Sequence, residues 1–369
     1  MTTARSEPAA AMVVGTGLIG GSIGMALRRR GWRVAGRDAD PARSRRALEL
    51  GALDALGDDP DAALTFIATP AGAVVDEARR VLHPAGRAAR SSEPGGIVTD
   101  VAGVKGPIVA ALAGEARFIG GHPMAGSEQD GVEGADAELF VGSTWALTPS
   151  AGTDPDAYAR LRGVIASLGA NAVAVSAGRH DDLVAVVSHV PHLAAAALMD
   201  LAAGAASEDA TLLHLAAGGF RDMTRVAAGH PGIWPDVVAE NRTGIVATLD
   251  RLSSALVEIR RIVAEGDRAA LLDLLERARE ARISLPTGAP PVAEAAEVRV
   301  PVPDRPGTIA EVTTLLGELG VNIYDVEIAH SVEGDRGVLV LVVDAGTVAV
   351  VQKALVGRGY RTSARALGR

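Results

Sequence analysis

VVGTGLIGGSIG, residues 13–24, decides the fold of the N-terminal part of the chain. Its glycines at 15, 17 and 20 have the spacing G-x-G-x-x-G, in which the first allows a tight turn, the second lets a pyrophosphate approach and the third lets a helix pack closely on a strand. The apolar run before them predicts a strand. The residues after them predict a helix, whose N-terminus attracts phosphate. The stretch therefore predicts a dinucleotide-binding turn, and the alternative is a glycine-rich turn in another α/β protein.

Asp38 indicates which dinucleotide is bound. It ends the second predicted strand, where an acidic side chain binds the adenosine ribose. A carboxylate repels a 2′-phosphate, so we expect NAD, although the neighbouring guanidinium of Arg37 leaves NADP open. The residues expected to contact the cofactor are Gly15, Gly17, Leu18, Ile19, Gly20, Asp38, Ala68, Thr69 and Pro70.

The pattern of apolar residues predicts three domains and an overall α/β class. Strands alternate with helices over residues 10–178, which predicts a Rossmann-type parallel sheet. Residues 179–283 have helical periodicity only, and the Pro/Ala-rich residues 284–296 are expected to be a linker. Residues 297–369 follow the order βαββαβ of a ferredoxin-like domain.

Composition excludes several classes of protein. Apolar residues make up 48% of the 369 residues, the formal net charge is −9, and there is no cysteine. An acidic chain with scattered arginines argues against nucleic-acid binding, and the missing cysteine excludes disulfides and thiolate sites. No signal peptide and no uninterrupted apolar run of about 18 residues is visible. We expect a cytoplasmic protein without membrane contact and without a metal.

Histidines and arginines stand where a substrate pocket is expected. GGHPMAGSE puts His122 at the carboxyl end of a predicted strand, the edge at which such sheets bind ligands. SHVPH puts His189 and His192 three residues apart on one helical face, although both could be ordinary core residues. GGFRDMTR places Arg221 and Arg225 on a common face of another predicted helix.

Over about residues 11–282 the chain resembles the prephenate/arogenate dehydrogenases. The motifs that carry the resemblance occur in the family's order and are GTGLIGGS, TDVAGVKG, GGHPMAGSE, HDDLVAVVSHVPH, GGFRDMTR and IWPDVVAENR. The tail resembles an ACT domain through PDRPGTIAEV and GVNI. This implies oxidative decarboxylation of prephenate to 4-hydroxyphenylpyruvate with reduction of NAD, in tyrosine biosynthesis. Arogenate is the alternative substrate, and a non-catalytic NAD-binding sensor is the alternative from another class.

The resemblance also implies roles for single residues. His122 would deprotonate the substrate hydroxyl, Arg225 would bind a substrate carboxylate, and His192 would line the pocket. The other residues expected at the substrate are Ser127, Glu128, Asp181, Gly218, Arg221, Asp222 and Trp234. One departure matters, because Gly103 stands where the family's D-x-x-S-V-K motif has serine. Loss of that hydroxyl could weaken the orientation of His122, unless a water or Ser127 replaces it.

Two further expectations concern assembly and regulation. The Ala-rich helices, poor in aromatic residues, would bury more apolar area by pairing between chains, so we expect a homodimer. In ACT domains the turn after the first strand and the start of the second strand often bind a free amino acid between paired domains, and Asp304, Gly307 and Asn322 are the candidates here. Tyrosine is the expected effector, and a purely structural dimerisation role is the alternative. No segment is left over for a mutase domain, so we expect a monofunctional chain.

Overall fold

The computed structural model describes residues 9–84, 96–127, 129, 131–206, 211–229, 231–284, 295–303, 305–330 and 336–367. Its chain divides into two compact units. One consists of Met1–Ala197 and Val226–Leu252, and the other of Leu198–Arg225 and Ser253–Arg369. Each unit is considered by itself.

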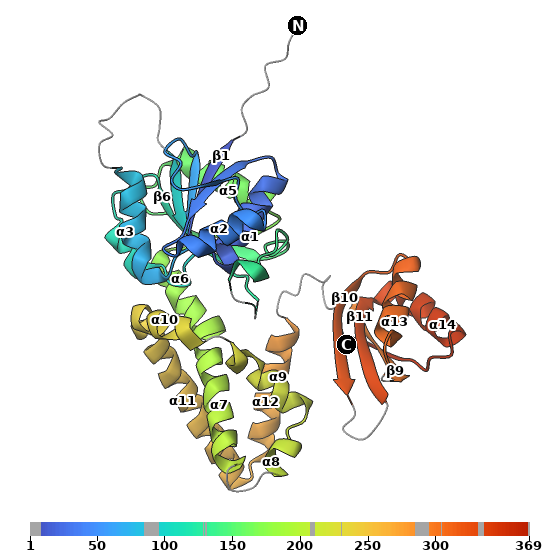
Figure 1. Cartoon of the computed structure of the whole chain (residues 1–369). Helices are drawn as coiled ribbons and strands as arrows, with labels where there is room; N and C mark the ends of the chain where they lie inside the picture. The colour runs from blue at the N-terminus through green and yellow to red at the C-terminus, as the bar shows by residue number, and fades with distance from the viewer. Residues whose placement is uncertain are drawn as a thin grey trace. The chain divides into compact units, whose positions relative to one another are not determined.

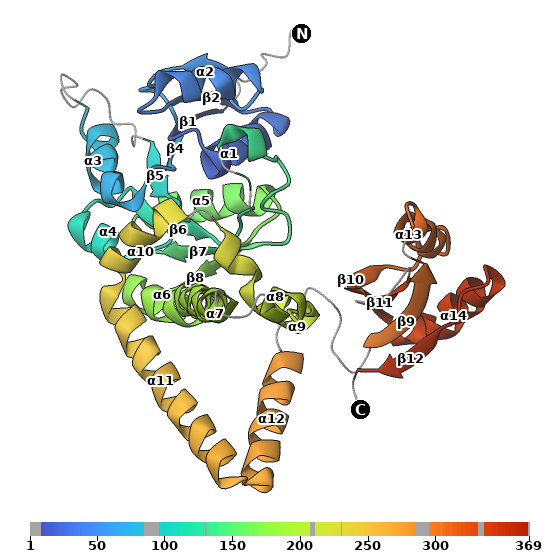
Figure 2. The same ribbon diagram turned by 60° about the horizontal axis from the view of Figure 1, so that its bottom comes forward.

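An eight-stranded sheet forms the centre of the first unit. Its strands are β1 (Ala10–Val14), β2 (Arg33–Arg37), β3 (Ala55–Leu56), β4 (Leu64–Ile67), β5 (Ile97–Asp100), β6 (Phe118–Pro123), β7 (Thr144–Thr148) and β8 (Asn171–Ala174). Their order is β3-β2-β1-β4-β5-β6-β7-β8, which Figure 2 shows from β2 down to β8. The helices that connect or follow them are α1 (Leu18–Arg29), α2 (Pro41–Glu49), α3 (Ala71–Leu82), α4 (Gly106–Ala111), η1 (Val132–Gly134) and α5 (Pro155–Ser167).

The predicted Rossmann-type fold is confirmed, with one correction to its purely parallel sheet. β6 and β7 pair antiparallel, with His122 opposite Ala146, whereas β7 and β8 pair parallel. The link between β6 and β7 contains only the short helix η1, and a parallel crossover usually needs a longer helical connection. The antiparallel pair brings the end of β6, and with it His122, beside the start of β7.

The core of this sheet is aliphatic with a few large aromatic side chains. Trp145 on β7 is fully buried, and its ring lies 5.0 Å from Phe140 and 6.2 Å from Phe66. Capping residues define where the surrounding helices begin: Asp40 and Asp154 each accept a hydrogen bond from a backbone N–H in the first turn of α2 and α5, and a proline follows each of them. The sequence signals for these helices are therefore local and strong.

The helical part of the chain follows β8. Its elements are α6 (Ala177–Val184), η2 (Ala185–His189), α7 (Val190–Ala206), α8 (Thr211–His214), α9 (Gly218–Thr224), η3 (Arg225–Ala228), η4 (Pro231–Ile233), α10 (Trp234–Glu240), α11 (Arg242–Glu265) and α12 (Arg268–Ile283). The run Ala177–Ala206 is continuous and long and apolar enough to cross a membrane by length and composition. The core helix of a soluble protein passes the same test. Figure 1 shows this run as α6 and α7.

The C-terminal residues form a small α/β sandwich with its own core. Its elements are β9 (Ala295–Pro303), α13 (Thr308–Glu318), β10 (Ile323–His330), β11 (Arg336–Asp344), η6 (Ala345–Thr347), α14 (Val348–Gly357) and β12 (Ser363–Ala366). The sheet order β10-β11-β9-β12 is that of a ferredoxin-like fold, as predicted. Val298, Val300, Leu316, Leu339 and Leu341 are fully buried between the sheet and the two helices, α13 and α14 (Figure 1). The predicted linker residues lie mostly outside the described ones.

Candidate active site

Three glycines in the turn between β1 and α1 have different surroundings. Gly15 and Gly20 lie against other backbone atoms, whereas Gly17 faces open space. A side chain at Gly15, whose φ is 92°, would collide with the carbonyl oxygen of Ala68, and one at Gly20 would collide with the carbonyl oxygen of Gly15. A Cβ at Gly17 would meet nothing within 4 Å. The turn is therefore closed by its own backbone and open at Gly17 and at the helix N-terminus, which fits a pyrophosphate.

The end of β2 favours a cofactor without a 2′-phosphate. The carboxylate of Asp38 accepts a hydrogen bond from the backbone N–H of Thr16 at 2.8 Å, so it is held over the glycine turn. The guanidinium of Arg37 could otherwise hold a 2′-phosphate, but it pairs with Asp58 at 2.5 Å and with Glu77 at 2.6 Å. Burial lowers the pKa of Arg37, but the hydrogen bonds and charges of Glu77 and Asp58 outweigh burial, so the pKa is raised overall. The arrangement suits the ribose hydroxyls of NAD.

A free hydroxyl marks the end of β4, beside the same turn. Thr69 is the second residue after the strand, and its buried Oγ1 has no hydrogen-bond partner among the residues that the structure describes. Ala68 and Pro70 flank it, and α3 begins at Ala71. A buried hydroxyl without a partner is costly, so this position is suited to a ligand group.

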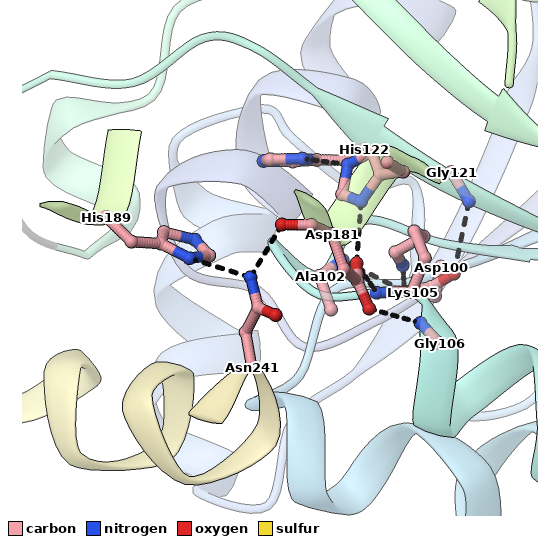
Figure 3. Close-up of polar contacts among 10 residues, drawn as sticks. Asp100, Ala102, Lys105, Gly106, Gly121, His122, Asp181, His189 and Asn241 are labelled. Carbon is pink, nitrogen blue, oxygen red and sulfur yellow. Dashed lines mark hydrogen bonds and ion pairs between the residues drawn. The ribbon is translucent and has the colours of Figure 1, made fainter. Parts of the chain in front are cut away.

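His122 is the first of three side chains in a hydrogen-bonded row (Figure 3). Its Nδ1 lies 2.9 Å from Nε2 of His180, and Nδ1 of His180 lies 2.8 Å from Oδ1 of Asp181. The Asp181 carboxylate also accepts hydrogen bonds from the backbone N–H groups of Lys105 at 2.8 Å and Gly106 at 2.7 Å. The row therefore begins at the end of β6 and ends at the N-terminal turn of α4.

A buried ion pair fixes the backbone beneath this row. Lys105 and Asp100 are both fully buried, and Nζ of Lys105 contacts the Asp100 carboxylate. Asp100 also accepts hydrogen bonds from the backbone N–H of Ala102 at 3.0 Å and of Gly121 at 3.1 Å. One carboxylate thus ties β5, the loop after it and β6 together, one residue before His122.

The surroundings keep His122 neutral. Burial lowers the pKa of His122 well below its usual value, and the nearby His180, Lys105 and His189 lower it further. Burial likewise lowers the pKa of Lys105, against the opposing effect of Asp100. A neutral imidazole has one nitrogen lone pair, so His122 can accept a proton from a substrate.

Further side chains connect Asp181 to the aromatic rings of the helical part of the chain. Asn241 donates from Nδ2 to the backbone oxygen of Asp181 at 2.8 Å, and the same nitrogen lies 3.1 Å from Nδ1 of His189 (Figure 3). The ring of Trp234 stacks on that of His192 with centroids 3.8 Å apart, and it meets His189 edge-on at 6.3 Å. The predicted residues His122, Asp181, His192 and Trp234 are thereby linked in one continuous set of contacts.

Comparison with known proteins assigns the chain to a family. The nucleotide-binding domain of prephenate dehydrogenase matches residues 23–174, its dimerization domain residues 176–277, and the ACT domain residues 296–356. A protein named prephenate dehydrogenase from Bacillus subtilis is 32% identical over 89% of this chain and 90% of its own length. The chain belongs to the prephenate dehydrogenase family. The resemblance expected from the six motifs is confirmed.

Two solved structures of similar proteins agree with this family assignment. The prephenate dehydrogenase of A. aeolicus in complex with hydroxyphenyl propionate and NAD⁺ is 27% identical, with a TM-score of 0.68, and matches 77% of this chain and 100% of its own. The arogenate dehydrogenase of Synechocystis is 32% identical, with a TM-score of 0.62, over 74% of this chain and 98% of its own. Relatives in the family thus carry both substrate names.

Gly103, where the resemblance led us to expect a serine, lies beside the ring of His122. A Cβ built on Gly103 would lie 3.7 Å from Nε2 of His122, which is an ordinary contact distance. A serine would therefore fit beside Nε2 of His122. With glycine at position 103, no side chain from this residue contacts that nitrogen. Ser127, the suggested replacement, is exposed and accepts a hydrogen bond from the backbone N–H of Gln129 at 3.1 Å.

The remaining predicted substrate residues fall in the second compact unit or outside the described residues. Glu128 is outside the described residues. Gly218, Arg221 and Asp222 lie in α9, and Arg225 begins η3. All four residues belong to the second compact unit and are exposed. Their predicted roles at the substrate stay predictions.

Sequence reasoning missed several polar residues of the site. His180, Lys105, Asp100 and Asn241 were not singled out, although each lies within a quoted motif of the family. Glu240 is a fifth: its Oε2 is buried without a partner among the described residues, and burial raises the Glu240 pKa, with Asp236 adding to the effect. Two pairs of adjacent polar residues in the sequence, His180–Asp181 and Glu240–Asn241, could have indicated three of these residues.

The ACT domain carries a surface hollow of about 660 Å³. Its lining residues are Arg305, Pro306, Gly307, Ile309, Ala310 and Thr313. Gly307, with φ of 89°, stands at the start of α13, and its role in effector binding stays a prediction. Asp304 lies outside the described residues, and Asn322 is exposed and is not part of this lining.

Proposed function

We propose that this chain is an NAD-dependent prephenate dehydrogenase, converting prephenate to 4-hydroxyphenylpyruvate and CO₂ in tyrosine biosynthesis. The family assignment supports the reaction class, and the relatives named prephenate dehydrogenase support the substrate. One observation carries the proposal for this chain. A neutral imidazole stands at the carboxyl end of the nucleotide-binding sheet, held from one ring nitrogen with the other facing Gly103.

The chemistry follows from that imidazole. Bound NAD would supply the acceptor for the hydride that leaves the ring carbon bearing the hydroxyl. His122 takes the hydroxyl proton on Nε2 as the carbon–oxygen double bond forms. The ring carboxylate then leaves as CO₂, its bonding electrons make the ring aromatic, and the oxygen takes the proton back. The reaction therefore releases no net proton, and His122 returns to its neutral form.

Binding of a substrate carboxylate needs a positively charged group, and the neutral His122 does not supply one. We propose that Arg225 binds a substrate carboxylate, because a planar guanidinium matches a carboxylate with two hydrogen bonds. Ser127, Glu128, Gly218, Arg221 and Asp222 are proposed to surround it, following the family motifs. Replacing Arg225 by alanine is expected to raise KM more than it lowers kcat, and steady-state kinetics would measure both.

The decisive experiment is an assay of four substrate and cofactor combinations. NADH or NADPH formation is followed at 340 nm with prephenate or arogenate and with NAD or NADP. We expect the highest kcat/KM for prephenate with NAD. NAD is expected over NADP because the guanidinium of Arg37 is already paired with two carboxylates and so does not favour a 2′-phosphate. A higher kcat/KM for arogenate would change the substrate and leave the family intact. No turnover with either substrate would contradict the proposal and favour a non-catalytic sensor.

We also propose that the chain is a cytoplasmic homodimer that pairs through its helices. Large apolar side chains on these helices are more than half exposed, namely Val187, Leu201, Val257, Val263, Leu272 and Leu275. The dimerization-domain match covers all of them. Exposed apolar area of this kind is buried favourably by a second copy. Sedimentation of the purified chain is expected to give twice the mass of 37.6 kDa, and a monomer at micromolar concentration would contradict the pairing.

A free amino acid is the proposed ligand of the hollow in the ACT domain. Gly307 exposes backbone at the start of α13, and Arg305 at its rim offers a positive charge to a carboxylate. We propose tyrosine, because an end product that binds there can report on the pathway in which the enzyme acts.

A further inference from the structure

Among the residues that the structure describes, His122 makes one side-chain hydrogen bond, and its partner is another histidine. The two rings come from parts of the chain 58 residues apart and meet edge-on, with centroids 5.1 Å apart at an angle of 71°. His180 is almost fully buried at 2% exposure, and so is Asp181 at 8%. The partner of His122 is therefore a ring that packing holds in place.

The protons in this row can be assigned from its far end. The Asp181 carboxylate already accepts two backbone N–H groups, from Lys105 and Gly106, and an ionised carboxylate can only accept. Nδ1 of His180 must therefore donate to it. In a neutral His180 the remaining nitrogen, Nε2, is then an acceptor, so Nδ1 of His122 must donate. The lone pair of His122 is left on Nε2, the nitrogen that faces Gly103.

We propose that His180 is a positioning residue that fixes the tautomer and orientation of His122, so that His122 presents an unprotonated Nε2 to the substrate. The inference rests on the proposed function for the substrate, but the arrangement of the three side chains does not. Imidazole in water favours the opposite tautomer, with the proton on Nε2, which could not accept a proton there. The hydrogen bond to His180 reverses that preference.

The missing side chain at Gly103 gives this contact its importance. Residue 103 has no hydroxyl with which to hold His122 from the Nε2 side, although a Cβ there would lie only 3.7 Å away. The ring is therefore held from its Nδ1 side. The buried pair of Lys105 and Asp100 fixes the backbone N–H groups that orient Asp181, so the support continues to the centre of the sheet.

Two variants of His180 test the role in turnover. His180→Leu removes the acceptor, and His180→Gln retains an amide oxygen for His122 and an amide N–H for Asp181. We expect kcat to fall about 10²-fold in His180→Leu, with KM for prephenate changed less than about threefold, and His180→Gln to recover most of the loss. His83→Gln is the matched control, because His83 is an exposed histidine paired with Glu115 at 2.8 Å outside the site.

The measured outcomes separate positioning from folding. Thermal unfolding and NAD affinity are measured for every variant. NAD affinity should match the wild type, and every variant should remain folded at the assay temperature, although His180→Leu is expected to melt lower because it removes a buried hydrogen-bonding side chain. A His180→Leu protein with kcat within threefold of wild type would overturn the inference. An equal loss in His180→Leu and His180→Gln would also overturn it, because a merely structural role does not depend on an acceptor atom.

A spectroscopic measurement decides the tautomer without any assay. The ¹⁵N chemical shifts of the His122 ring in the full-length protein, assigned by comparison with His122→Asn, distinguish a protonated Nδ1 from a protonated Nε2. We expect Nδ1–H in the wild type and a shift toward Nε2–H in His180→Leu. A wild-type ring with Nε2–H would overturn the inference even if prephenate is turned over. Absence of turnover with the expected tautomer would instead contradict only the proposed function.

Discussion

Single residues in this site have their charge states set by what is buried beside them. His122 faces Lys105, His180 and His189, and Asp181 lies beyond His180. Burial and these neighbours lower the His122 pKa, so the ring is neutral at physiological pH. A neutral ring is ready to accept a proton, and protonation of the folded protein at this position is disfavoured.

The lowered pKa predicts that stability is lost in acid. In the unfolded chain His122 binds a proton below about pH 6.5, whereas the folded chain does so only at a much lower pH. The unfolded state therefore binds more protons in that window, and the free energy of unfolding falls as pH drops, by up to about 1.4 kcal/mol per pH unit from this group. Urea unfolding from pH 8 to pH 5 measures the slope, and His122→Asn should flatten it. Equal slopes in the two proteins would contradict this prediction.

The loss of His122 itself should affect the rate far more than binding. His122→Asn keeps a polar side chain at the end of β6 but cannot take the hydroxyl proton at the position of Nε2. We expect kcat to fall about 10²- to 10⁴-fold, the usual effect of losing an acid–base group. Steady-state kinetics at pH 7.5 would measure it, with NAD affinity as the control. A variant with wild-type kcat would remove His122 from the mechanism.

The elements of the fold differ in how far the sequence could predict them. The glycine turn and the βαββαβ order are encoded by neighbouring residues, so local patterns predicted them. The caps at Asp40 and Asp154 are local features of the same kind. The antiparallel pairing of β7 depends on how a long loop returns, and no local pattern marks it. The contact between His122 and His180 likewise depends on tertiary packing across 58 residues. Motifs could therefore predict His122 but not its partner.

The irregular turn between α6 and α7 is an element with a visible cause. Over Ala185–His189 the helix widens, and the N–H of Val190 bonds to the oxygen of Ala185, five residues back. Pro191 follows and has no N–H to donate, so the regular i→i−4 pattern cannot continue through it. The widened turn carries His189 toward Asn241 and precedes His192, which stacks on Trp234.

Removing that proline should disturb the substrate pocket. In Pro191→Ala the new N–H can bond to the oxygen of Val187, and a regular helix would rotate the following residues by about 100°. We expect KM for prephenate to rise about tenfold, because His192 would leave its place on Trp234, while the melting temperature stays the same or rises. Pro155→Ala is the matched control, since Pro155 occupies the first turn of α5, where no N–H is needed. Unchanged kinetics in Pro191→Ala would mean that the widened turn does not position His192.

At the scale of the whole molecule, the proposed effector site and the proposed active site use different residues. The hollow is lined only by residues between Arg305 and Thr313, and the ACT domain has a core of its own. A ligand bound in the hollow can therefore change turnover only through an equilibrium between states of the protein that both sites influence. Such coupling is reciprocal, so each ligand must change the affinity of the other by the same factor.

That reciprocity is a prediction that the full-length chain can test. Calorimetric titration with tyrosine, with and without a saturating product analogue and NAD, should give two dissociation constants whose ratio equals the change in analogue affinity caused by tyrosine. Gly307→Val should weaken tyrosine binding about tenfold, because φ of 89° at this position strains any side-chain-bearing residue. Gly359→Val is the matched control, since Gly359 has nearly the same φ of 88° in the same domain but lies outside the lining of the hollow. Absence of tyrosine binding to the wild type would contradict the effector proposal, and equal weakening in both variants would mean that the hollow is not where tyrosine binds.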